Sequence, residues 1–92
     1  LFAVNDLCAL SAMLVLQKHN RAVPKDIKII GFDDMRLLDY FQPSLTSVRQ
    51  DFYKIGLAAA KEVLRRIQDP ESVPLKDIIP TELITRHSCG CR

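Results

Sequence analysis

The stretch Ile27-Lys28-Ile29-Ile30-Gly31-Phe32-Asp33-Asp34 decides the fold of this chain. It follows Val23-Pro24-Lys25-Asp26, in which the proline and the charged residues indicate a helix stop and a turn. A short apolar run between turn signals is typical of a buried strand in a parallel sheet. We therefore expect a strand that ends in two adjacent carboxylates.

These two carboxylates, Asp33 and Asp34, have two interpretations. Ligands of open α/β sheets bind beyond the carboxyl ends of the strands, which makes the pair a candidate ligand site. Aspartate is also favoured in turns and at helix N-caps, and local chemistry alone favours that structural role. Side chains alternate along an extended strand, so we expect only one of the two to face a ligand. Gly31 has no Cβ and lets backbone or ligand approach closely.

A strand and a helix are expected before this stretch. Residues 1–4 indicate a short buried strand, and an apolar run capped by Asn5 or Asp6 predicts a helix to about residue 20. Strand, helix and parallel strand form a βαβ unit. The amide of Asn5 and the carboxylate of Asp33 then share one edge of the sheet and suit hydroxyl groups. The helix is apolar almost all round, which fits core packing, a subunit interface or both.

The second half of the chain predicts a helical turn over residues 35–41 and an extended segment over residues 45–50. A long helix starts at Asp51 and runs to about residue 68, with apolar spacings of three and four that indicate one buried face. Gln50 is either a solvated loop residue or a side chain that reaches a cleft. The last strand is expected over residues 78–86, irregular or at an edge because Pro80 cannot donate to a ladder.

Composition limits the class of protein. The 92 residues are 48% hydrophobic and 26% charged, which is much apolar surface for a small body, so we expect a fragment of a longer chain or an oligomer. A net charge of +2 gives no electrostatic footprint for nucleic acid. No apolar run reaches the length of a membrane span. Three cysteines do not suggest a disulfide framework, and a reducing cytosol is the simpler assumption.

The tail His87-Ser88-Cys89-Gly90-Cys91-Arg92 holds three candidate metal ligands, but their spacing is not that of a structural zinc site. A disordered tail is the simpler interpretation. We find no phosphate loop and no convincing catalytic order of Ser, His and Asp, so we expect no catalytic residue, metal or cofactor. An enzyme with Mg²⁺ on Asp33 and Asp34 is the least favoured alternative, because no nucleophile or phosphate site accompanies them.

Read together, the segments resemble one family: the effector-binding core of lactose-repressor-type (LacI/GalR) bacterial transcription regulators, which has a periplasmic-binding-protein-like fold. The matching residues keep the family's order and spacing from about residue 2 to residue 88. They are Phe2-Ala3-Val4-Asn5-Asp6 with Ala9; Val23-Pro24-Lys25-Asp26-Ile27; Ile29-Ile30-Gly31-Phe32-Asp33-Asp34; Pro43 with Leu45-Thr46-Ser47-Val48-Arg49-Gln50; Gly56 with Ala59; and Pro80-Thr81-Glu82-Leu83-Ile84 with Arg86 and Ser88.

The resemblance implies a type I periplasmic-binding-protein-like α/β fold, a three-layer sandwich with a parallel sheet, of which this chain is the C-terminal portion. Residues 1–49 and 75–88 would belong to the second subdomain, residues 50–74 would supply a helix of the first, and residues 89–92 would form a tail. The family's helix-turn-helix headpiece is absent from this chain. The Cys-Gly-Cys tail is not a general family feature, which raises the alternative of a sensor module fused to another signalling domain.

The resemblance also implies a function without catalysis. A small effector, a sugar or a nucleobase with a sugar favoured, would bind between the subdomains and control DNA binding through the headpiece. A solute-binding protein for sugar transport is an alternative. The regulator would be a cytoplasmic homodimer. Family positions that match Asn5, Asp33 and Gln50 face the ligand, and that of Phe52 lies close by. The predicted dimer surface comprises Leu7, Leu10, Leu14, Tyr40 and Phe41.

Overall fold

The structure is a computed structural model that describes residues 1–91, apart from the side chain of Asp39. The chain divides into two compact units. The first comprises Leu1–Gln50 together with the segment from Glu82 onward, and the second is Asp51–Thr81. The predicted subdomain limits (1–49, 50–74 and 75–88) refer to a larger protein and stay a prediction.

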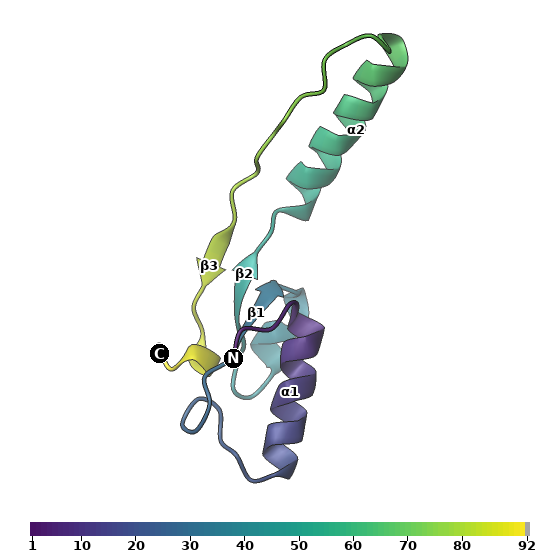
Figure 1. Ribbon diagram of the computed structural model, residues 1–92. Coiled ribbons are helices and arrows are strands. Elements are labelled where there is room, and N and C mark those ends of the chain that lie inside the picture. Colours follow the sequence, from purple (N-terminus) through teal and green to yellow (C-terminus); the bar gives the residue numbers. More distant parts are fainter. Residues whose placement is uncertain (92) are drawn as a thin grey trace. The chain divides into compact units, whose positions relative to one another are not determined.

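A three-stranded sheet in the order β1-β2-β3 forms the centre of the first unit (Figure 1). Its strands are β1 (Ile30–Asp33), β2 (Thr46–Arg49) and β3 (Glu82–Ile84). β1 and β2 run parallel, so their carboxyl ends meet at one edge, where Asp33 lies opposite Arg49. β3 is antiparallel to β2. The fold class is therefore α/β, with a parallel strand pair at the centre and an antiparallel strand at one side.

The N-terminal segment and the central strand are parallel, as predicted, but both strands differ from their predicted limits. The strand predicted over residues 1–4 is reduced to one bridge between Phe2 and Ile30. The central strand, predicted at residues 27–31, starts at Ile30 and continues to Asp33. The reason is that the Ile29 N–H donates to the Ser88 carbonyl at 2.9 Å and so serves a turn near the end of the chain. The last strand is likewise shorter than the predicted 78–86.

α1 (Asp6–Lys18) begins where the sequence predicts and ends two residues before the predicted Asn20. Asn5 is its N-cap, because its Oδ1 accepts a hydrogen bond from the Cys8 N–H at 2.8 Å. Asn20 has a φ of +56°, a conformation that ends helices. α1 lies against β1 and contributes to the core (Figure 1). The buried core residues are Ala3, Ala9, Met13, Ile29, Leu38 and Leu45.

Two short 3₁₀ helices complete the first unit. η1 (Arg36–Tyr40) confirms the helical turn predicted after the acidic pair. η2 (His87–Cys89) corrects the prediction of a disordered tail, because its residues Ser88 and Cys89 are buried. The cysteine count did not suggest a disulfide, yet Cys89 and Cys91 are joined as one. Arg92, the last residue of the predicted tail, lies outside the described residues.

The second unit consists of α2 (Phe52–Gln68) and the extended segment that follows it. α2 starts directly after Asp51, in line with the predicted helix start, and Asp51 is its N-cap, since its Oδ1 accepts from the Lys54 N–H at 3.0 Å. The prediction of one buried face is wrong within this chain, because no residue of α2 is buried. The apolar stripe is present, and its large residues are exposed. No described helix is long and apolar enough to span a membrane.

Candidate functional site

The candidate site lies at the carboxyl ends of β1 and β2. Asp33 has a φ of +105° and Asp34 a φ of +59°. Residues other than glycine rarely adopt positive φ values. Such strain costs about 1–3 kcal/mol per residue and persists only where the surroundings hold it. Two such residues in a row require surroundings that hold the backbone in this conformation.

A buried carboxylate and a hydroxyl hold the strained turn. The Asp34 N–H donates to Ser47 Oγ at 3.0 Å, and the Met35 N–H donates to Asp6 Oδ2 at 2.8 Å. The Ser47 hydroxyl donates in turn to Asp6 Oδ1 at 2.6 Å. Asp6 is fully buried and opens α1, where the helix dipole favours a negative charge. The start of α1 and β2 thus fix the backbone that follows β1.

Gly31 makes this arrangement possible. A Cβ at Gly31 would overlap Asp6 Oδ1 and would lie 3.1 Å from a methyl group of Leu45. The close approach predicted at this glycine is therefore made by the first residue of α1.

Asp34 is paired with two arginines. Arg49 Nε lies 2.7 Å from its Oδ2, and Arg86 Nη1 lies 2.8 Å from its Oδ1. The side chain of Asp34 is only 4% exposed, so solvent and ligands have little access to it. Two cations compensate the burial of one carboxylate, which otherwise costs several kcal/mol. Asp34 therefore has the structural role expected of one member of the pair.

Asp33 has a different environment from its neighbour. Gln50 Nε2 donates to Asp33 Oδ1 at 2.7 Å, so two of the predicted ligand residues meet from the ends of β1 and β2. Both side chains are half-buried. A carboxylate offers about four acceptor positions, so Asp33 can accept further hydrogen bonds while it holds Gln50. A carboxylate beside an amide is suited to ligand hydroxyl and N–H groups.

The other two predicted ligand residues have separate surroundings. Asn5 uses its Oδ1 as the N-cap of α1, so its Nδ2 group is the part suited to a ligand acceptor. Phe52 opens α2 in the second unit, where its side chain is exposed. Their contact with a ligand stays a prediction.

Sequence reasoning missed three residues that build the site: Asp6, Ser47 and Arg86. Asp6 carried a signal, because it is the one acidic residue at the start of a long apolar run. Ser47 and Arg86 carried none, since their partners are distant in sequence and their residue types are common on surfaces.

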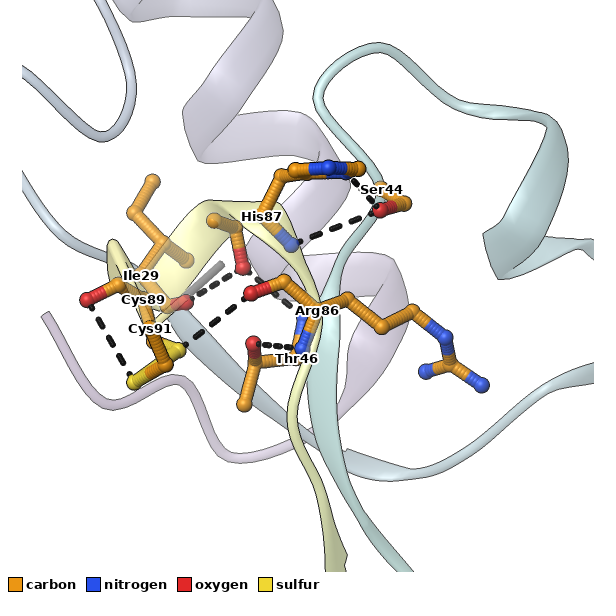
Figure 2. Close-up of a disulfide and its surroundings, with 8 residues drawn as sticks. Ile29, Ser44, Thr46, Arg86, His87, Cys89 and Cys91 are labelled. Carbon is orange, nitrogen blue, oxygen red and sulfur yellow. Dashed lines mark hydrogen bonds between the residues drawn. A yellow bond between two sulfur atoms is a disulfide. The ribbon is translucent and has the colours of Figure 1, made fainter.

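The tail does not form a metal site. Among residues 1–91, no group of three or more His, Cys, Asp and Glu side chains is placed to hold a metal ion. Cys89 and Cys91 are bonded to each other, and His87 Nδ1 lies 2.8 Å from Ser44 Oγ (Figure 2).

The residues predicted at a dimer surface lie on α1 and around η1. Leu7, Leu14 and Tyr40 are well exposed, with Tyr40 the most exposed at 82%. Phe41 is also exposed, whereas Leu10 is half-buried and packs against the core. A hollow of about 240 Å³ lies between the second half of α1 and residues 41–43. An apolar surface of this kind suits association, and the interface itself stays a prediction.

Comparison with known proteins identifies the family. Residues 1–89 match the family model of the periplasmic binding protein-like domain. The chain belongs to this family. It is 36% identical over its 92 residues to the HTH-type transcriptional repressor PurR of Aliivibrio fischeri. It spans 27% of that protein, so it corresponds to about a quarter of its relative's length.

Solved structures agree with this assignment. A LacI family transcriptional regulator from Enterococcus faecium with bound ribose superimposes with a TM-score of 0.84 at 33% identity, over 95% of this chain and 33% of that one. The complex of the transcriptional regulator CelR with cellobiose gives a TM-score of 0.88 at 33% identity, over 95% of this chain and 27% of that one. The predicted resemblance to LacI-type regulators and their periplasmic-binding-protein-like fold is confirmed.

Proposed function

We propose that this chain is the C-terminal part of the ligand-sensing domain of a LacI-type transcription regulator. The effector is a small polar molecule, a sugar or a nucleobase. A sugar is favoured because the similar regulators carry ribose and cellobiose. The ligand acts by binding one closure state of the domain more tightly than another, since only a difference in affinity shifts such an equilibrium. A DNA-binding headpiece elsewhere in the protein responds to that shift.

The pair Asp33–Gln50 carries this proposal. It lies at the carboxyl edge of parallel strands, where open α/β sheets bind ligands. Asp34 next to it is paired with Arg49 and Arg86, whereas Asp33 accepts from the neutral amide of Gln50. The strained turn holds Asp33 in place in advance, which lowers the entropy lost when a ligand binds.

Two further features of the whole protein belong to the proposal. It binds its effector without catalysis, and it works in the cytoplasm as a homodimer. The repressor and regulator relatives favour this function over sugar transport.

Titration calorimetry on the full-length protein tests the ligand site. The wild type is titrated with ribose, cellobiose and the purine bases, and Asp33→Ala is then titrated with whichever ligand binds. Loss of one charge-assisted hydrogen bond, worth about 1.5–3 kcal/mol, weakens binding roughly 10- to 150-fold. Operator binding without effector stays intact. Asp26→Ala is the matched control, because Asp26 is an exposed aspartate that accepts from the nearby Ala22 N–H.

Equal effector affinity in wild type and Asp33→Ala, with circular dichroism showing an intact fold, would contradict the assignment. Asp34→Ala separates the two carboxylates further. Because Asp34 is buried between two arginines, its loss lowers the thermal unfolding temperature rather than acting on the ligand directly.

Sedimentation of the full-length protein tests the dimer. Leu14 is a better probe than Leu10, because Leu14 is exposed and Leu10 packs against the core. Burial of one such side chain at an interface is favourable by about 1.5–3 kcal/mol, and a charge reverses that gain. Leu14→Arg is expected to sediment as a monomer, while Val73→Arg, at an exposed apolar residue of the second unit, stays dimeric. A dimeric Leu14→Arg protein would place the interface elsewhere.

A further inference from the structure

The motif Cys89-Gly90-Cys91 has no part in the proposed effector site. Its two sulfur atoms are joined, and Gly90 between them has a φ of +72°, which glycine adopts without strain. The cysteines are only two positions apart in sequence. A disulfide stabilises a fold mainly by closing a long loop of the unfolded chain, so a ring this short contributes little. Stability alone does not explain the pair.

The two cysteines differ in their access to solvent. Cys89 is 6% exposed at the end of η2, whereas Cys91 is exposed. Cysteine reactivity toward dissolved reagents follows exposure, so a small molecule reaches Cys91 first. Cys89 is then placed to complete the reaction from within the protein. Cys8 is a third, free and exposed thiol on α1 and serves as an internal reference.

The turn that carries Cys89 is attached to the start of β2 and to the residue just before β1, and Figure 2 shows several of its contacts. The Ser88 hydroxyl donates to the Ile29 carbonyl at 2.7 Å and accepts from the Thr46 N–H at 2.8 Å. The Ser88 N–H donates to the Ser44 carbonyl at 2.9 Å. Cys89 Sγ therefore lies in a turn that is tied to the sheet, while Cys91 follows Gly90 and is exposed. This arrangement suits an exchange pair, with one sulfur buried in the protein and one open to solvent.

We propose that Cys89 and Cys91 form a reversible thiol–disulfide exchange site for low-molecular-weight disulfides. In the reduced protein, the Cys91 thiolate attacks one sulfur of the small disulfide, whose S–S bond breaks and releases one small thiolate. The Cys89 thiolate then attacks Cys91 Sγ, and the second small thiolate leaves as the protein disulfide forms. Two electrons pass from the protein to the small disulfide, and the two cysteine protons go to the released thiolates. A small dithiol reductant reverses the sequence.

Mass spectrometry of the full-length protein tests the exchange directly. The reduced protein is treated with oxidised glutathione, quenched with acid and N-ethylmaleimide, and digested. We expect the peptide that holds Cys89 and Cys91 to lose two hydrogens and to escape alkylation, and dithiothreitol to restore both thiols. If both cysteines are still alkylated after the oxidant, the proposal is wrong.

Single substitutions test the order of the two steps. Cys89→Ser removes the resolving thiol, so glutathione stays bound at Cys91 as a mixed disulfide. Cys91→Ser leaves only the buried thiol of the pair, and the peptide that holds Cys89 is expected to react at least about tenfold more slowly than Cys91 does in Cys89→Ser. Cys8→Ser is the matched control and leaves the exchange unchanged. Equal rates in Cys89→Ser and Cys91→Ser, with both variants folded by circular dichroism, would overturn the assignment of Cys91 as the entry site. This inference does not depend on the effector, so it stands or fails separately from the ligand titrations.

Discussion

α1 and α2 are both long capped helices with apolar residues, yet only α1 contributes buried residues to a core within this chain. α1 is apolar almost all round, and it packs Ala9 and Met13 into the core beside β1. α2 has the regular stripe of a helix that covers a core, but none of its residues is buried within this chain. Periodicity therefore tells which face of a helix requires a partner. It does not tell whether that partner belongs to the same stretch of chain.

The exposed stripe of α2 has a physical consequence. Its large apolar residues are Phe52, Ile55, Val63, Leu64 and Ile67. Contiguous exposed apolar surface of this kind marks a site of association with other protein. This chain corresponds to about a quarter of the relative PurR, so we expect other parts of the full-length protein to cover the stripe.

Among the substitutions that test this comparison, the largest loss in the free energy of unfolding is expected at Asp6, in the first unit. Asp6→Ala leaves the Ser47 hydroxyl and the Met35 N–H without their buried acceptor. Each unpaired buried donor costs about 1–3 kcal/mol in the free energy of unfolding. Urea unfolding of the full-length protein measures the loss, and Asp26→Ala, at an exposed acceptor, is expected to cost much less. A similar cost in the two variants would mean that Asp6 does not hold the turn.

Met13 on α1 is expected to give the next largest effect. Met13→Ala removes a buried side chain and leaves a cavity, which costs about 2–5 kcal/mol. The same urea experiment measures it, with Gln17→Ala on an exposed position of α1 as the control. A loss below 1 kcal/mol, by the usual size of surface effects, would show that α1 is not packed as described.

Leu64→Ala on α2 tests the other side of the comparison. Its effect on the free energy of unfolding depends on whether another part of the protein covers the apolar stripe. If other parts of the full-length protein bury Leu64, Leu64→Ala lowers the free energy of unfolding by about 2–5 kcal/mol, as in a core. Lys61→Ala is the control on the charged face of the same helix. A change within about 0.5 kcal/mol would show that the stripe stays exposed in the whole protein.

The smallest expected effect is the pH dependence of the ion pair between Glu62 and Arg65 in the second unit. Hydrogen bonds from the Arg65 guanidinium to Glu62 lower the pKa of that carboxyl below its ordinary value. Because the pKa of Glu62 is lower in the folded protein, its interaction with Arg65 stabilises the fold fully above the ordinary pKa of the carboxyl. This stabilisation is lost as the pH falls through the lowered pKa. An acid titration of the Leu75 amide signal by NMR follows it, since this N–H donates to Glu62 Oε1 at 3.4 Å. Glu62→Gln is expected to abolish the titration; a titration that persists in this variant would assign it to another group.

The sequence predicted features that depend on neighbouring residues. The cap Asn5, the helix start at Asp51 and the parallel relation of the first segments follow from local chemistry and from chain connectivity, and the structure confirms them. The sequence placed Asn5 and Asp33 at one edge of the sheet and left the place of Gln50 open, and the structure brings Gln50 to Asp33. Their role in binding a ligand stays a prediction.

Features that depend on residues far apart in the chain could not be predicted from the sequence. The start of β1 depends on a hydrogen bond between Ile29 and Ser88, which no local pattern indicates. The burial of Asp34 depends on Arg86 from the far end of the chain, so the sequence predicted a turn or cap where the structure has ion pairs. The prediction of a disordered tail was wrong for the same reason, because Ser88 of η2 is bonded to Ile29, just before β1, and to Thr46 of β2.

The position of Asp6 on α1 links the turn at Asp33 and Asp34 mechanically to the exposed face of that helix. Asp6 and Leu7 are consecutive, but Asp6 is buried against the turn while Leu7 is exposed on the predicted dimer surface. The helical backbone between them is stiff, with its N-terminus capped and Ala9 and Met13 packed in the core. If the proposed effector binds at Asp33, a movement of this turn is passed directly to the first residue of α1, whose exposed face carries the predicted dimer surface.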